Sequence, residues 1–194
     1  MTQDTRFPRL VSLACHDLRT PLATVHGFAR TLTRSGGLGE PASRYVEMIE
    51  QASAQIAELV DELGIAAQIE AGRYEPASRA TDTLELARTA ARRLGEDRVA
   101  VSGDGGRVTG DPEALGRAVS ALVRCALRHG GLERVEVTAS GAELLVAPVT
   151  PASAPVLLGE ELRDLGAAVA VTVVRAVGGS IDVVGTALQV RLPA

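Results

Sequence analysis

A short segment near the start of the chain, HDLRT at residues 16–20, combines three side-chain types that support phosphoryl chemistry. A neutral imidazole such as that of His16 is a good nucleophile toward phosphorus. The adjacent carboxylate of Asp17 can accept its N–H proton and hold the ring tautomer. Thr20 lies one helical turn after His16, so its hydroxyl shares a face with the imidazole and can position a water for the reverse, hydrolytic direction.

The element that must carry His16 is a long amphipathic helix. Its apolar residues follow steps of three and four, close to heptad spacing, at Val11, Ala14, Leu18, Leu22, Val25, Ala29 and Leu32. His16 lies two residues from both Ala14 and Leu18, about 200° around the helix from each. We therefore expect His16 to point outward from the apolar seam. Pro21 should bend the helix, because it cannot donate to the carbonyl of Asp17.

A second helix repeats the pattern after a glycine-rich break at 35–41 that ends in a proline suited to a helix start. Its apolar steps alternate four and three without a fault, at Tyr45, Ile49, Ala52, Ile56, Leu59, Leu63 and Ala66. The two segments predict an antiparallel helical hairpin. One hairpin leaves its seam facing water, and pairing two of them into a four-helix bundle is the common solution. We therefore expect a homodimer; the alternative is that the rest of the chain covers the seam.

Composition excludes several classes of protein. The net charge is −4 and aromatic residues make up 2% of the chain, which argues against a nucleic-acid-binding protein. The sequence shows no signal peptide and no apolar run long enough to span a membrane, so a cytoplasmic protein is expected. The two cysteines, Cys15 and Cys125, stand in no CxxC motif, and no disulfide or metal site is predicted. His26 and His129 are interpreted as ordinary packing residues.

The second half mixes helix and strand signals. Helices are expected at 84–95, 111–130 and 159–179, the second with Asp111 as N-cap, Pro112 in the first turn and Gly130 past the end. Strands are expected at 98–103, 106–110, 133–140, 142–149, 180–185 and 187–194. The segment SGDGG at 102–106 is interpreted as a hairpin turn between the first two strands. This order predicts an α/β sandwich, a mixed sheet with helices on one face.

HDLRTPL at 16–22, followed by GFARTL and by RYVEMIEQASAQIAELVDELGIAAQIEAG at 44–72, resembles the dimerisation and histidine-phosphotransfer domain of bacterial sensor histidine kinases. By this resemblance, His16 is the phospho-accepting residue and Asp17 assists phosphoryl transfer. The pair Asp17 and Thr20 matches the family's phosphatase motif. Arg19 and the outward helix face would dock a response-regulator receiver domain.

The second half resembles the family's catalytic ATP-binding domain in DPEALGRAV, ALRHG and AVGGSIDVVGTALQVRLP, but it departs at the three nucleotide boxes. Ala121 and Cys125 stand where the family has asparagines, the second of which holds Mg²⁺, and a thiol is a poor ligand for that hard cation. Ala147 stands near the position where the family has its adenine-binding aspartate. Gly166 is alone where a glycine-rich turn should cradle phosphates. We expect that binding of ATP and Mg²⁺ is lost.

These features predict a helical hairpin at 1–72, a linker at 73–82 and a degenerate ATP-binding-like domain at 83–194. The leading hypothesis is a histidine phosphotransferase, similar to those derived from kinases, that carries a phosphoryl group on His16 between receiver-domain aspartates. Its partners would be a receiver domain and an upstream phosphodonor kinase or receiver. Three alternatives stay open: a degenerate kinase acting as a response-regulator phosphatase or docking partner, an active kinase with an atypical ATP site, and a structural dimer.

Overall fold

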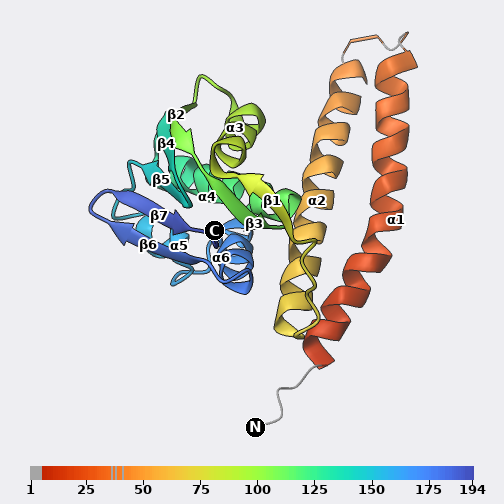
Figure 1. The fold of residues 1–194 in the computed structure, drawn as a ribbon. Helices are drawn as coiled ribbons and strands as arrows, with labels where there is room; N and C mark the ends of the chain where they lie inside the picture. Colours follow the sequence, from red (N-terminus) through yellow and green to blue (C-terminus); the bar gives the residue numbers. More distant parts are fainter. Residues whose placement is uncertain (1–5, 36, 38, 41) are drawn as a thin grey trace. The chain divides into compact units, whose positions relative to one another are not determined.

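The computed structural model describes the backbone of residues 6–35, 37, 39–40 and 42–194, with the side chains of these residues other than 6–10, 12–14, 17 and 35. The chain divides into two compact units, Met1–Arg73 and Tyr74–Ala194. The first is a pair of helices, and the second combines helices with strands (Figure 1).

The first unit is the predicted antiparallel hairpin of two long helices, α1 (Arg6–Ser35) and α2 (Ala42–Glu70). Pro21 lies inside α1, and Figure 1 shows that the N-terminal part of this helix is inclined to the remainder. This agrees with the expected bend, because proline removes one helical hydrogen bond and its ring crowds the carbonyl four residues earlier. The predicted helix-starting residue, Pro41, lies outside the described residues.

The apolar residues of the hairpin separate into two lines with a spacing of seven residues. The line between the two helices is made mostly of small side chains, and its buried members include Cys15, Ala29, Val60, Ala67 and the polar Ser53. The second line, which we call the open stripe, consists of larger side chains that stay 37–50% exposed: Leu18, Val25, Leu32, Ile49, Ile56 and Leu63. The predicted seam thus left out most of the residues that join the two helices, and six of its larger members form the stripe that faces away from the partner helix.

The second unit is built on a five-stranded mixed sheet in the order β2-β4-β5-β7-β6. Its strands are β2 (Val99–Gly105), β4 (Val135–Ser140), β5 (Glu143–Ala147), β6 (Ser180–Val184) and β7 (Ala187–Arg191). Only the β2–β4 pair of this sheet is parallel. The pair β4–β5 is the predicted hairpin across Gly141, which takes the positive φ of 54° that such a tight turn requires.

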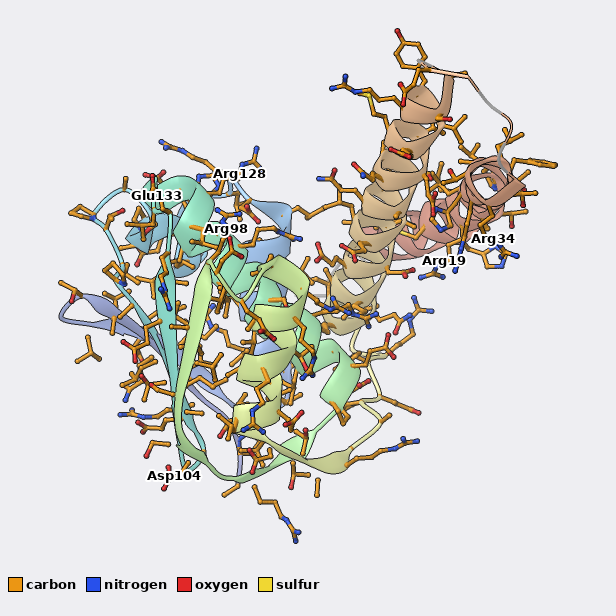
Figure 2. All side chains as sticks on the ribbon, turned by 90° about the horizontal axis from the view of Figure 1, so that it is seen from above. Arg19, Arg34, Arg98, Asp104, Arg128 and Glu133 are labelled. Carbon is orange, nitrogen blue, oxygen red and sulfur yellow. The ribbon has the colours of Figure 1, made fainter. Side chains whose placement is uncertain are left out.

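Helices cover one face of this sheet, which completes the predicted sandwich (Figures 1 and 2). They are α3 (Thr83–Leu94), α4 (Pro112–Gly130), the short α5 (Ala154–Leu157) and α6 (Leu165–Ala176). Alternate strand residues point into the core, among them Val137, Leu144 and Leu188, each fully buried. Asp111 caps α4 and Pro112 occupies its first turn, as predicted. The left-handed residue that ends α4 is Gly131, and Gly130 is still helical.

The predicted hairpin between β2 and β3 (Arg107–Gly110) is wrong. Strand β2 pairs with β4, and β3 pairs with β1 (Arg79–Asp82) in a separate two-stranded sheet. The glycines of SGDGG serve a bulge between Gly103 and Gly105, where the register shifts. A Cβ atom added at Gly103 would lie 1.9 Å from the carbonyl oxygen of Ala139, so this glycine permits close pairing with β4.

The predicted linker and the third predicted helix also need correction. Residues 79–82 of the expected linker form β1, and Asp82 caps α3 by accepting a hydrogen bond from the amide of Leu84 at 2.8 Å. The third helix starts at Leu165, well after the predicted start at residue 159. Asp164 is its N-cap, and a side-chain cap of this kind defines where the helix begins.

Candidate functional site

His16 lies on the exposed surface of α1, directly after the buried Cys15. Successive helical residues point about 100° apart, so the packing of Cys15 turns His16 toward solvent. Thr20, one turn later, is also exposed. The predicted outward direction of His16 is therefore confirmed, while the chemical roles of His16 and Thr20 stay predictions.

Arg19 connects the two helices beside this face. Its Nε donates to Oδ1 of Asp61 on α2 at 2.7 Å, and both side chains are about half exposed. Gly64 of α2 leaves room for the guanidinium, since a Cβ atom there would lie 3.3 Å from Nη2 of Arg19. An exposed ion pair of this kind contributes little to stability. Arg19, labelled on the hairpin in Figure 2, is thus engaged with Asp61, and its docking role stays a prediction.

The side chain of Asp17, the predicted proton acceptor, lies outside the described part of the structure. One turn after Thr20, the hydroxyl of Thr24 donates to the carbonyl oxygen of Thr20 at 3.0 Å, a local bond common for threonine in helices. His26 is half-buried, with Nδ1 3.3 Å from both the carbonyl oxygen of Glu50 and Oγ of Ser53, as expected of a packing residue.

In the second unit, the residues at the predicted nucleotide boxes are mostly apolar and buried. Ala121 and Cys125 of α4 are 2% and 0% exposed. Burial raises the pKa of the Cys125 thiol to about 12, and the nearby charge of Asp164 adds to the rise. Ala147 is the last residue of β5 and is half-buried. These side chains offer no carboxylate or amide oxygen to a cation.

The N-terminus of α6, where the resemblance would place a phosphate cradle, is occupied by a carboxylate of the chain itself. Oδ1 of Asp164 accepts a hydrogen bond from the amide of Ala167 at 3.0 Å. A helix N-terminus attracts anions through its unpaired amides. Here an anion is already built in, and Gly166 in the same turn is buried.

Asp164 also belongs to a cluster that the sequence analysis missed. Its Oδ2 lies 3.3 Å from Nε2 of His129, and ligand atoms of Cys125, His129 and Asp164 all lie within 4.8 Å of one another. The sequence analysis predicted no metal site at Cys125, and that stays a prediction; what it missed is that Cys125 lies in this cluster. The available signal was the spacing of Cys125 and His129, which places both on one face of α4. No local pattern pointed to Asp164.

Three comparisons connect this geometry to known proteins. Residues 9–72 match the family model of the His Kinase A (phospho-acceptor) domain. Sensor protein DivL of Caulobacter vibrioides is 33% identical over 122 residues, which cover 59% of this chain and 16% of DivL. Histidine protein kinase DivJ of the same organism is 29% identical over 222 residues, covering 95% of this chain and 37% of DivJ. The chain thus spans well under half the length of these two relatives.

The fold has solved counterparts. Full-length ShkA in complex with AMPPNP matches 96% of this chain with 46% of its own, at a TM-score of 0.65 and 20% identity. This likeness covers both the hairpin and the sheet domain. None of the helices in the described part of the chain combines the length and the apolar character needed to span a membrane.

Proposed function

Because the chain belongs to the family of bacterial sensor histidine kinases, we propose that it is a histidine phosphotransfer protein. It would accept a phosphoryl group on His16 from a receiver-domain aspartate and pass it to a second one. The observation that carries this proposal is the contrast between the two units. The exposed imidazole of His16 stands in a matched phospho-acceptor domain, whereas Asp164 caps the helix N-terminus at the expected phosphate site.

The proposed transfer uses only protein groups. A ring nitrogen of His16 attacks the phosphorus of the aspartyl phosphate, the N–P bond forms, and the bond from phosphorus to the carboxylate oxygen breaks. The electron pair returns to the carboxylate of the receiver. The proton on the other ring nitrogen is held by Asp17, which stabilises the charged ring. The reverse sequence hands the group to the next receiver.

The second unit supports the proposal that phosphate does not come from ATP. The buried Ala121 and Cys125 offer no oxygen ligand to Mg²⁺. The carboxylate of Asp164 would repel a phosphate at the start of α6. These residues do not fit the nucleotide, so no step of the proposed mechanism passes through it.

The open stripe supports a homodimer as the working unit. Six large apolar side chains lie along one face of the two helices at 37–50% exposure, and a second hairpin would cover them in a four-helix bundle. A C2 pair would present two copies of His16 on its outer surface. A cytoplasmic location is part of the same proposal, since receiver domains and phosphodonor kinases would have to reach both copies.

The test is a transfer assay with the full chain. Receiver domains of the organism that encodes this chain are loaded with labelled phosphate and tested one by one. One of them should transfer the label to the chain and should also take the label back from the labelled chain. His16→Ala should abolish the transfer, and the matched variant His26→Ala should retain it, because His26 packs against Glu50 and Ser53. Labelling of His16 by ATP and Mg²⁺ alone would refute the relay and indicate an active kinase.

A phosphatase is the second candidate, favoured by the exposure of Thr20 one turn from His16. In that case the receiver loses phosphate to water in the presence of His16→Gln but not of Thr20→Ala. Thr24→Ala is the matched control, because this threonine is exposed one further turn along the same helix. If the receiver loses its label only when His16 is present, the relay is supported instead.

A further inference from the structure

Three side chains with different donor atoms converge between α4 and α6 of the second unit. Cys125 and His129 lie four residues apart and so on one face of α4, and Asp164 lies at the start of α6. Their ligand atoms all lie within 4.8 Å of one another, and Nε2 of His129 is 3.3 Å from Oδ2 of Asp164. Two separate helices therefore aim a thiol, an imidazole and a carboxylate at one point.

The same three residue types could form a nucleophilic cysteine site, but burial opposes this. The thiol of Cys125 is 0% exposed, and burial raises its pKa to about 12. A reactive cysteine needs an accessible thiolate in an electropositive setting. Cys125 has neither access nor a low pKa, so its arrangement with His129 and Asp164 is not that of an active nucleophile.

The donor set matches a transition-metal ion much better. Thiolate, imidazole and carboxylate are the usual ligands of Zn²⁺, at about 2.0–2.3 Å. With the distances above, a point exists within about 2.6 Å of all three ligand atoms, so shifts of a few tenths of an ångström would complete the bonds. We infer that Cys125, His129 and Asp164 bind one Zn²⁺ ion in the second unit.

Charge balance supports the same assignment. One thiolate and one carboxylate together neutralise a divalent cation, and a neutral imidazole adds no charge. The filled site would therefore be uncharged, as suits a location where Cys125 is fully buried and the side chain of Asp164 is 7% exposed. The thiol proton leaves to solvent when the zinc–sulfur bond forms. Of the three side chains, His129 is the most exposed, at 19%, and water would be the fourth ligand of a tetrahedral ion.

Binding would connect two elements that are distant in sequence. Zinc would connect the C-terminal part of α4 to Asp164, the residue that precedes α6. Oδ1 of Asp164 could keep its hydrogen bond to the amide of Ala167. The inference concerns the second unit alone and does not depend on phosphotransfer by His16.

The test uses the untagged, metal-free full chain with Co²⁺ as a spectroscopic probe and Zn²⁺ as competitor. One equivalent of Co²⁺ should produce a thiolate-to-metal charge-transfer band, which Zn²⁺ should remove. The Cys125→Ser variant should lose the band, and His129→Gln should bind Zn²⁺ at least about tenfold more weakly. Asp164→Asn keeps a side chain that can cap α6 and should also bind Zn²⁺ more weakly. The melting temperature of each metal-free variant shows whether it is folded.

The matched control is Cys15→Ser, which removes the other buried cysteine. Cys15 lies beside His16, so this variant also tests whether the hairpin captures the metal. Retention of the band in Cys15→Ser, together with its loss in Cys125→Ser, supports the site. The inference is overturned if the unaltered chain shows no charge-transfer band, or if the band survives in Cys125→Ser. Zinc affinity unchanged in a folded His129→Gln variant would also overturn it.

Discussion

The open stripe yields a prediction whose magnitude follows from the structure. Ile56 lies in the middle of α2 and is 47% exposed within one chain. Full burial of an isoleucine side chain stabilises by about 1.5–3 kcal/mol, so covering the exposed half contributes about 0.7–1.4 kcal/mol in each protomer. A symmetric dimer contains the contact twice, and its loss therefore amounts to about 1.4–2.8 kcal/mol.

This figure converts directly into a dissociation constant. Each 1.4 kcal/mol corresponds to a factor of ten, so Ile56→Ala should weaken the dimer about 10- to 100-fold. Ile56→Asp adds the cost of removing a carboxylate from water on both sides of the axis, and we expect it to weaken the dimer at least about 1,000-fold. Sedimentation over a series of protein concentrations measures both constants.

The control places the same charge elsewhere on α2. Gln51 is exposed and lies five residues before Ile56, about 140° around the helix. Gln51→Asp should therefore leave the dissociation constant within about threefold of that of the unaltered chain, well below the tenfold step of 1.4 kcal/mol. If Ile56→Asp sediments as the unaltered chain does, or if Gln51→Asp dissociates equally, the open stripe is not the dimer interface.

Three further predictions concern the second unit. Gly103→Ala should destabilise it by roughly 3 kcal/mol or more in denaturant titrations, because its Cβ would meet a backbone carbonyl at 1.9 Å. The control, Gly131→Ala, has open space around it and should cost only about 1 kcal/mol. Equal losses of stability in the two variants would contradict the close-packing argument. A hydrogen bond from Arg191, with a second from Gln189, holds the pKa of Glu143 below its usual value, so Arg191→Gln should raise that pKa in an NMR titration. The same bond stabilises the fold above the unfolded pKa and is lost as pH falls through the folded one. The pKa of Cys125 rises from 9.0 to about 12 on folding, so stability should fall as pH increases between these values, and Cys125→Ala should flatten this decline in thermal melts.

Much of the fold was predictable because local signals and tertiary packing agree. The heptad steps predicted both long helices of the hairpin, and Asp111 followed by Pro112 marked the start of α4. The outward direction of His16 was also predicted correctly, although the contact between the helices is made by Cys15 and not by Leu18 of the predicted seam. In each of these cases, the information lies within a few turns of one element.

The errors arose where distant segments decide the structure. Nothing near SGDGG reveals that Gly103 faces the backbone of β4, so a tight turn was the natural interpretation. The pairing of residues 79–82 with β3 is equally non-local. The cluster at Cys125 was missed for the same reason, since its third member, Asp164, stands on another helix.

The small side chains between α1 and α2 have a consequence for how much protein a cell needs. Cys15, Ala29, Ser53 and Ala67 bury little apolar area within one hairpin, so a second chain in the proposed dimer would add much of its stabilisation. Folding of the hairpin would then follow mass action, unlike that of the second unit with its own core of fully buried leucines. Under the proposed function, phosphotransfer by His16 would therefore rise more steeply than protein concentration where the chain is dilute, because two chains would have to meet before the helix carrying His16 is stabilised.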